Sequence, residues 1–475
     1  MSNESTSRIA EPPLSRPVRV AAIAGIAAVF AALRLLQLAW RPPFFDELFT
    51  VWIASQPPDH ILEALLHDSG PPLYYFLVHL GGVAWWGVIA ARVISLLAAS
   101  ALLAAILWSR RLGNAALGAA LLLAVFAPHV HFSTEARAYA LAGALAGGGC
   151  LALAAWAAGG KRARLAWGTL LLVGAAACHY YGVLFFPIPF ALALLARRPR
   201  AIAEGAIASA AAGIAFLPGF LLASRQPSES IAWMRLVGRA PSSLDPLANL
   251  AMMADYPRVF IVPPPQWLHL VALAITVAVV VAGARSAEAR RWGVMTLVPV
   301  AMAIAFGLAG RNVYFPVRFE AVLAGPFVCW IGTSLLAISK RPLRAALTIA
   351  LLALGVIASY YGVMTSLGKR PDRWRQAATF VRRTVPESIP IVASGYTYLE
   401  VIAQKDAAWK PLVRGFPREI QDHPGWVVQP RVESLAREEL PPLPFVWAGE
   451  RGSAEHRALV RWYKLRPLLV GKGMI

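Results

Sequence analysis

Long uninterrupted apolar runs are the feature that most constrains the fold of this chain. The first covers residues 18–40, and at about 1.5 Å per helical residue it reaches roughly 34 Å, enough to cross a hydrocarbon core of about 30 Å. A polar acidic loop follows it instead of a small-residue cleavage site, which favours a membrane span over a signal peptide. Similar runs follow, and 58% of the residues are hydrophobic against 15% charged, so we expect a membrane protein.

The net charge of +20 would suggest nucleic-acid binding in a soluble chain. Here the basic residues gather in the short turns between apolar runs, as the positive-inside rule requires of cytoplasmic turns. We therefore expect membrane lipids and no nucleic acid as partners, and we place these turns in the cytoplasm. Their basic residues are Arg8, Arg16, Arg19, Arg110, Arg111, Lys161, Arg162, Arg164, Arg197, Arg198, Arg200, Arg285, Arg290, Arg291, Lys340, Arg341 and Arg344.

Single spans then alternate between the two sides of the membrane, starting from a cytoplasmic N-terminus. Residues 71–108 make one net crossing but hold more than one helix of material. A helix over 72–83 would reach only about 18 Å, so we interpret it as interfacial or re-entrant. An aromatic belt at the outer interface would then hold Tyr74, Tyr75, Trp85 and Trp86. The count is eleven full spans, or up to thirteen, and the other ten are 18–40, 114–132, 138–158, 163–179, 181–197, 201–223, 266–284, 291–309, 319–338 and 343–363.

The apolar runs end at residue 363, and the pattern after it changes. The segments IPIVASG and PFVWAGE predict short strands, whereas residues 371–385 and the segment TYLEVIAQ predict helices. We therefore expect a mainly α, polytopic transmembrane helical bundle followed by a small C-terminal α/β domain outside the cytoplasm. The predicted parts are a cytoplasmic tail (1–17), a membrane domain (18–363) with outer loops 41–70 and 224–265, and an extracytoplasmic domain (364–475).

The first outer loop carries an acidic pair, Asp46 and Glu47, directly after the first span in the string RPPFFDELFT. Adjacent carboxylates can differ in role, one accepting a proton while the other orients or binds a substrate. On an ordinary surface the better interpretation would be a solvated pair at the start of a helix. The flanking phenylalanines place this pair at the membrane surface instead, and Arg41 is the one obvious cation nearby in the sequence. Asp68 lies in the same loop.

Three further polar clusters fall on turns that the topology places on the outer side. They are HFSTEARAYAL with Glu135 and Arg137, CHYYG with His179, Tyr180 and Tyr181, and RNVYFPVRFE with Arg311 and Arg318. Taken singly, these residues could be snorkelling cations or aromatic interface anchors. Together, carboxylates, arginines and a histidine on one side of a bilayer suit an anionic amphiphile whose head group is handled at the interface.

These strings resemble the GT-C superfamily of glycosyltransferases. The similarity points to the bacterial dolichyl-phosphate-mannose protein mannosyltransferase-like proteins, which include the lipid A aminoarabinose transferase and the lipopolysaccharide galacturonic-acid transferases. It rests on the ordered set FFDELFT, HDSGPPLYYFLVHL, FSTEARAYAL, CHYYG, PVRFE and PDRWRQAATFV, and it covers nearly the whole chain. The chain departs from the family pattern at Phe319, where most members have tyrosine, and at Gly70, where many have histidine.

The resemblance implies an inverting transfer of a sugar from a polyprenyl-phosphate donor to a glycan, lipid or protein acceptor at the outer face of a bacterial inner membrane. Asp46 would be the base for the acceptor hydroxyl, and Glu47 would support orientation. Arg137 and Arg318 would bind the donor phosphate, because a guanidinium fork matches phosphate oxygens. Further substrate-binding residues would be Glu135, Asp68, Arg311, His179, Tyr180 and Tyr181.

No cofactor is required by this scheme, and a divalent metal stays open because no ligand spacing in the sequence demands one. The three cysteines, Cys150, Cys178 and Cys329, lie in apolar runs and indicate neither a disulfide framework nor a zinc site.

Two other functions remain to be weighed against an enzyme. A flippase or transporter for a lipid-linked sugar usually places ionisable groups near the bilayer midplane. Here Glu135 and Glu320 lie at turns and Glu204 lies near a cytoplasmic end, which argues against ion coupling. A non-catalytic membrane scaffold would not need a paired carboxylate beside an aromatic interface.

Overall fold

The structure is a computed structural model of the whole chain. It describes residues 15–41, 45–66, 69–226, 266–309, 313–314 and 317–368, together with three strands at 391–394, 413–416 and 446–448.

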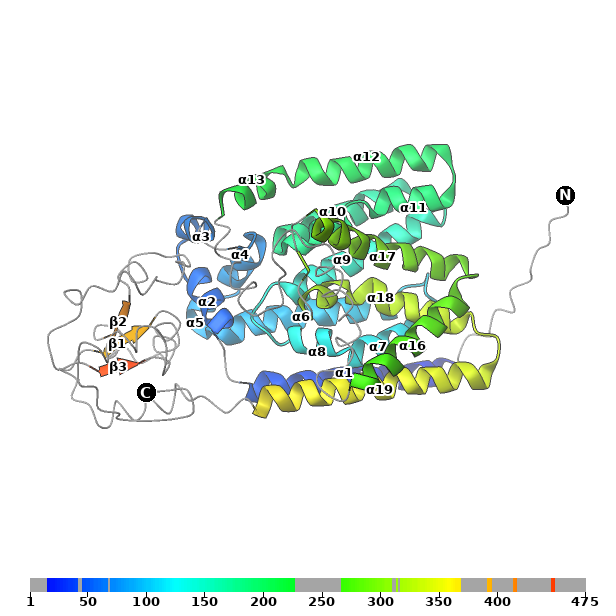
Figure 1. Cartoon of the computed structure of the whole chain (residues 1–475), viewed down its shortest axis with the longest axis horizontal. Coiled ribbons are helices and arrows are strands. Elements are labelled where there is room, and N and C mark those ends of the chain that lie inside the picture. The colour runs from blue at the N-terminus through cyan, green and yellow to red at the C-terminus, as the bar shows by residue number, and fades with distance from the viewer. Residues whose placement is uncertain are drawn as a thin grey trace.

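The membrane-spanning prediction is confirmed, because helices, many of them apolar, make up most of the described chain. Six of them are long and apolar enough to cross a membrane, and a bent pair raises the number to seven. The six are α1 (Arg16–Trp40), α6 (Val88–Leu107), α9 (Tyr139–Ala157), α17 (Ala287–Leu308), α18 (Arg318–Leu336) and α19 (Arg341–Gly368). Figure 1 shows α1 and α19 side by side along one edge of the bundle.

The other predicted spans fall on shorter or interrupted helices. Residues 163–179 and 266–284 correspond to α10 (Arg162–Cys178) and α16 (Gln266–Gly283). Three spans that the sequence predicts as continuous are broken, each at a proline-containing stretch, since proline cannot donate a helical hydrogen bond. These are α7 (Ala115–Val125) with α8 (Ala127–Phe132), η1 (Tyr180–Phe185) with α11 (Ile188–Ala196), and α12 (Pro199–Ala215) with α13 (Leu217–Arg225), the last pair bent by 44°.

The first outer loop and the stretch after it form four short helices at one end of the bundle (Figure 1). They are α2 (Phe45–Ala54), α3 (Pro58–Leu65), α4 (Leu73–Leu80) and α5 (Val83–Trp86). Gly82 adopts a left-handed conformation (φ 78°) between α4 and α5, so the chain turns there. Helix α4 has eight residues, and the interfacial or re-entrant placement of this stretch stays a prediction.

The predicted aromatic belt is correct for its two tryptophans and wrong for its two tyrosines. Trp85 is 84% exposed and Trp86 is also exposed, as an interface anchor should be. Tyr74 and Tyr75 are buried instead, and the Tyr74 hydroxyl lies 3.1 Å from Ser95 Oγ on α6. These two tyrosines therefore fix α4 to its neighbours and do not face lipid.

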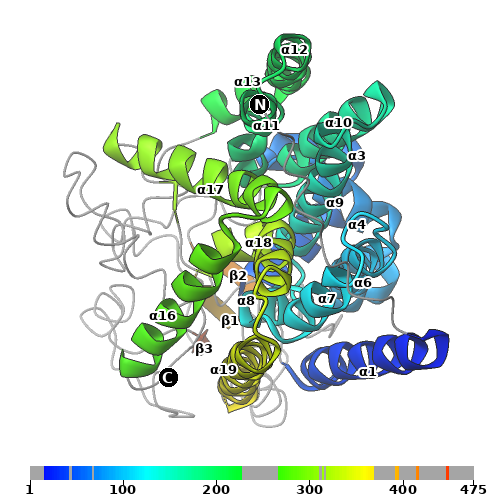
Figure 2. The ribbon, with the colours of Figure 1, turned by 90° about the vertical axis from the view of Figure 1, so that its right-hand side faces the viewer.

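Helix α18 lies at the centre of the bundle, among α7, α9, α16 and α17 (Figure 2). Its packing against α9 requires glycine. A Cβ at Gly143 would lie 2.7 Å from the Ala321 carbonyl oxygen, and one at Gly325 would lie 2.8 Å from Gly147 Cα. Small residues let the backbones of membrane helices approach closely. This central position puts Arg318, the first residue of α18, in the middle of one end of the bundle.

Some turns predicted to be cytoplasmic also come together. Glu288 accepts hydrogen bonds from Arg111 (3.1 Å) and Arg291 (2.8 Å). Glu204 accepts them from Arg162 (2.7 Å) and Arg200 (3.2 Å) in the same way. Within the described residues, basic turns far apart in the sequence thus share acidic partners.

The three strands form a parallel sheet in the order β2-β1-β3. β1 (Ile391–Ser394) and β3 (Val446–Ala448) confirm the strands predicted in IPIVASG and PFVWAGE. β2 (Val413–Phe416) was not predicted, because an arginine and a glycine interrupt its apolar pattern. The predicted helices at 371–385 and in TYLEVIAQ lie outside the described residues, so the domain division at 364–475 stays a prediction.

Candidate functional site

The predicted outer clusters converge at one end of the bundle. Asp46 and Arg318 are 272 residues apart in the chain, yet Arg318 Nη2 lies 3.3 Å from Asp46 Oδ2. Asp46 is 26% exposed and Arg318 18% exposed at the side chain, so neither is sealed inside the protein. The Arg318 guanidinium also lies over the ring of Tyr139, 5.7 Å from its centroid.

The neighbouring carboxylate, Glu47, points the other way and is fully buried. Adjacent helix residues point about 100° apart, so the first turn of α2 presents its two acids to different surroundings. Arg92 donates from Nε to Glu47 Oε1 (2.8 Å) and from Nη2 to Oε2 (2.6 Å), and the backbone N–H of Ala136 donates to Oε1 (2.8 Å). Arg92 is therefore the cation hydrogen-bonded to Glu47. Arg41, the cation expected from the sequence, hydrogen-bonds Glu135 instead, and its carbonyl oxygen accepts from Arg92 Nη1.

Arg41 pairs with another acid of the site, Glu135. Arg41 Nη2 lies 2.7 Å and His131 Nε2 3.0 Å from Glu135 Oε2. Burial acts to raise the pKa of the Glu135 carboxyl, but Arg41 and His131 outweigh it and hold that pKa well below its ordinary value. The charged form of Glu135 is therefore favoured, and its hydrogen bonds anchor this turn.

Three consecutive residues, Glu135, Ala136 and Arg137, are each held by a different helix. Glu135 is tied to Arg41 at the end of α1, and the Ala136 N–H is tied to Glu47 on α2. The carbonyl oxygen of Arg137 accepts from Ser95 Oγ on α6 at 3.3 Å. The turn that carries the Arg137 side chain is therefore fixed from three sides.

The Arg137 and Arg318 guanidinium groups act on the same neighbour, His179. Burial, followed by the charges of Arg137 and Arg318, lowers the pKa of His179 to about 3. The His179 ring contacts the rings of Tyr139 and Tyr181, with centroids 4.7 Å and 4.4 Å away and the ring planes tilted by 40° and 39°. The charges of Arg137 and Arg318 thus act on one buried imidazole and on each other.

The two tyrosines after His179 have different partners. The Tyr181 N–H donates to His179 Nδ1 at 3.2 Å, and the Tyr181 ring packs against Phe319. Tyr180 donates from its hydroxyl to Gln226 Oε1 at 2.8 Å. Gln226 in turn donates to the carbonyl oxygens of Leu65 and Gly70, so Tyr180 is part of a link between α13 and the first outer loop.

Two predicted site residues, Asp68 and Arg311, lie outside the described residues. Among those described, no three His, Cys, Asp or Glu side chains gather as a metal site would require. Arg92 and Tyr139 also belong to this site and were not predicted from the sequence. A lone arginine inside the apolar run at 88–107 was the available signal, since ionisable residues in spans are rare and pair with others.

No protein-family model and no curated protein matches this chain. Solved structures do. ArnT from Cupriavidus metallidurans in the apo state is 14% identical, with a TM-score of 0.59 over 96% of this chain and 97% of that chain. The same protein bound to undecaprenyl phosphate is 13% identical, with a TM-score of 0.57 over 97% and 98%. The chain therefore has the ArnT fold over nearly its whole length.

Proposed function

We propose that this chain, which shares the fold of ArnT, is an inverting glycosyltransferase of the bacterial inner membrane that takes its sugar from a polyprenyl-phosphate carrier. The observation that carries the proposal is the pairing of a partly exposed carboxylate, Asp46, with Arg318, close to a second arginine, Arg137. Such a set provides a base and two phosphate ligands at one end of a membrane bundle.

Arg137 and Arg318 would hold the phosphate of the donor. Burial and the charges of these two guanidinium groups lower the pKa of His179 to about 3, so His179 adds no third charge at neutral pH. The contact of Arg318 with Asp46 is single and 3.3 Å long, and a phosphate with more acceptor oxygens can compete for the same fork. ArnT has been solved with undecaprenyl phosphate, and a carrier of that class fits this arrangement.

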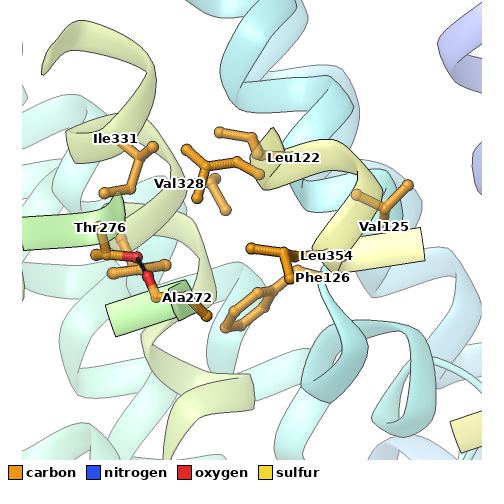
Figure 3. Close-up of a pocket in the computed structure, with 11 residues that line it drawn as sticks. Leu122, Val125, Phe126, Ala272, Thr276, Val328, Ile331 and Leu354 are labelled. Atoms are coloured by element: carbon orange, nitrogen blue, oxygen red, sulfur yellow. Dashed lines mark hydrogen bonds between the residues drawn. The ribbon is translucent and has the colours of Figure 1, made fainter. Parts of the chain in front are cut away.

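The carrier also needs an apolar surface within the membrane. An apolar pocket lies between α7, α16, α18 and α19, as Figure 3 shows. Its lining includes Phe327, Val328 and Ile331 of α18, the helix that begins with Arg318. Val328 follows Arg318 by ten residues, a rise of about 15 Å along a helix. A chain attached to a phosphate at Arg318 could run along α18 to this pocket.

Asp46 would accept the proton of the acceptor hydroxyl. The acceptor oxygen attacks the anomeric carbon of the sugar, the bond from that carbon to the phosphate oxygen breaks, and polyprenyl phosphate leaves as an anion stabilised by the arginines. Direct displacement inverts the anomeric configuration. A hexose or a pentose would serve as the sugar, and a glycan, a lipid or a protein would supply the hydroxyl. Each step uses side chains of this chain, and no metal-dependent step is assigned.

Replacing Asp46 by asparagine tests the proposal. Asn is nearly the same shape but cannot take the proton, so we expect at least about a hundredfold loss of turnover, with donor binding retained. Asp59→Asn is the matched control, because Asp59 lies on the neighbouring helix α3 with its side chain 80% exposed. The measurement is transfer by purified protein in lipid, supplied with extracts of polyprenyl-phosphate sugars and envelope acceptors.

Turnover of Asp46→Asn within a few-fold of the unchanged protein would contradict the assignment of the base. A protein that moves the lipid-linked sugar across vesicles without transferring it would instead be a flippase. Binding of neither donor nor acceptor would favour a scaffold.

A further inference from the structure

The break between α7 and α8 has a defined chemical cause. Within a continuous helix, the N–H of residue 128 would donate to the carbonyl oxygen of Ala124, but residue 128 is proline and has no N–H. The chain is extended at Phe126, between the two helices. In a membrane interior, carbonyl groups freed in this way must find other donors.

Arg34 supplies the missing donors. It lies on α1, fully buried, and donates from Nη1 to the Ala124 carbonyl oxygen (3.0 Å) and from Nη2 to that of Leu123 (3.4 Å). Nη2 also lies 2.8 Å from Nδ1 of His129, on α8 beyond the break. One guanidinium thus contacts both sides of the break. Arginine suits this role better than lysine, because its rigid fork offers several donors in fixed directions whereas lysine offers a single ammonium.

The remaining open carbonyl is satisfied from α19. Ser359 donates from Oγ to the Val125 carbonyl oxygen at 2.7 Å. One turn earlier on α19, a Cβ at Gly355 would lie 3.1 Å from the same oxygen, so the close approach of α19 favours glycine there. Arg34 and Ser359 together replace the helical hydrogen bonds that this break removes.

The contacts of Arg34 continue along α1 toward the site. Gln37 follows three residues later on the same side of the helix, and Arg41 follows directly after the helix ends at Trp40. Both are buried. Thr134 donates to Gln37 Oε1 at 2.9 Å, and Arg41 holds Glu135. Arg34, Gln37 and Arg41 therefore contact the chain at successive points, from the break to the turn that carries Arg137.

We propose that Arg34 is a positioning residue for Arg137: by bridging the α7–α8 break, it sets the direction of α8 and with it the place of the Arg137 guanidinium in the anion site. The proposal rests on the proposed function only in naming the anion as a donor phosphate. The positioning itself is a claim about the fold.

The test is a double-mutant cycle read out by binding of undecaprenyl phosphate to the full chain in detergent. Arg34→Met alone should weaken binding about tenfold or more, whereas in an Arg137→Met background it should change binding less than about twofold, because residues acting through one group are not additive. Arg34→Lys should bind undecaprenyl phosphate with an affinity between those of Arg34→Met and the unchanged protein. Arg19→Met, on an exposed part of the same helix, should leave binding unchanged in either background.

Additive effects of Arg34→Met and Arg137→Met would overturn the proposal, since independent sites add. Should Arg34→Met fail to fold, Ser359→Ala opens the same break more gently and must show the same non-additivity.

A second readout does not need the ligand. The rate at which a charged maleimide labels Arg137→Cys should change at least about threefold on adding Arg34→Met, while the native cysteines are buried. An unchanged labelling rate would refute the positioning role. If the unchanged protein binds no undecaprenyl phosphate, the proposed function fails and the labelling rate alone decides the role of Arg34.

Discussion

Removing the charge of Glu47 should cost stability, whereas removing that of its neighbour Asp46 should cost turnover. Glu47 Oε1 accepts hydrogen bonds from Arg92 Nε and the Ala136 N–H, and Oε2 accepts one from Arg92 Nη2. The backbone fixes the Ala136 N–H, and burial fixes the Arg92 guanidinium, so these donors cannot reorient toward other acceptors. In Glu47→Gln an amide NH₂ replaces one oxygen and faces at least one of these donors. Breaking a buried ion pair from one side costs about 3–5 kcal/mol, and we expect about 3 kcal/mol because Gln keeps one acceptor.

The assay is the midpoint temperature of unfolding in detergent, with turnover measured well below that midpoint. Glu47→Gln should lower the midpoint by at least roughly 3 °C, while Asp46→Asn should shift it by less than about 1 °C. The double change Glu47→Met, Arg92→Met should recover much of the loss, because it removes both charges, but not all of it, since the Ala136 N–H loses its acceptor. A normal midpoint for Glu47→Gln would refute the view that Glu47 holds this turn.

Three further outcomes are expected. Arg137→Lys and Arg318→Lys keep the charge but lose the fork, so each should weaken donor binding about tenfold with little change in unfolding midpoint. His179 has a pKa of about 3 in the folded chain, against 6.5 ordinarily. The stability that its neutral form contributes is therefore complete above pH 6.5 and is lost as the pH falls toward 3. In His179→Asn the unfolding midpoint temperature should fall less between about pH 7.5 and pH 5 than it does in the unchanged protein. A reporter active only outside the cytoplasm should be active when fused after Ile475, and activity of a cytoplasmic reporter there would reverse the predicted topology.

The convergence of the outer clusters could be predicted from the sequence because topology alone determines it. Apolar runs of membrane length and basic turns assign sides, and turns on one side of a compact bundle must be near one another. Asp46, Arg137, His179 and Arg318 were expected at one end for this reason, and the structure has them there. It could not give their pairing, which depends on the rotation of each helix.

Arg92 shows why the ion pairs could not be predicted from the sequence. Its partner Glu47 lies 45 residues earlier, and no local spacing connects them. Arg41 is near Glu47 in sequence but is directed to Glu135, 94 residues later. The break at Pro128, in contrast, has a local cause and could have been predicted from the missing N–H. What could not be predicted there is that Arg34 would fill the gap.

The charges of this end differ in how tightly they are held, and that difference separates supporting groups from reactive ones. Arg92 and Glu47 share two hydrogen bonds of 2.8 and 2.6 Å and are almost inaccessible to solvent. Asp46 and Arg318 share one contact of 3.3 Å and both remain partly exposed. A reactive carboxylate must exchange partners during turnover, so a short, doubly bonded, buried pair would be unsuited to it. Under the proposed function, this end of the bundle would use both kinds of pair: tightly bonded ones that fix the turn at 135–137, and a loosely bonded one whose members would bind the substrate.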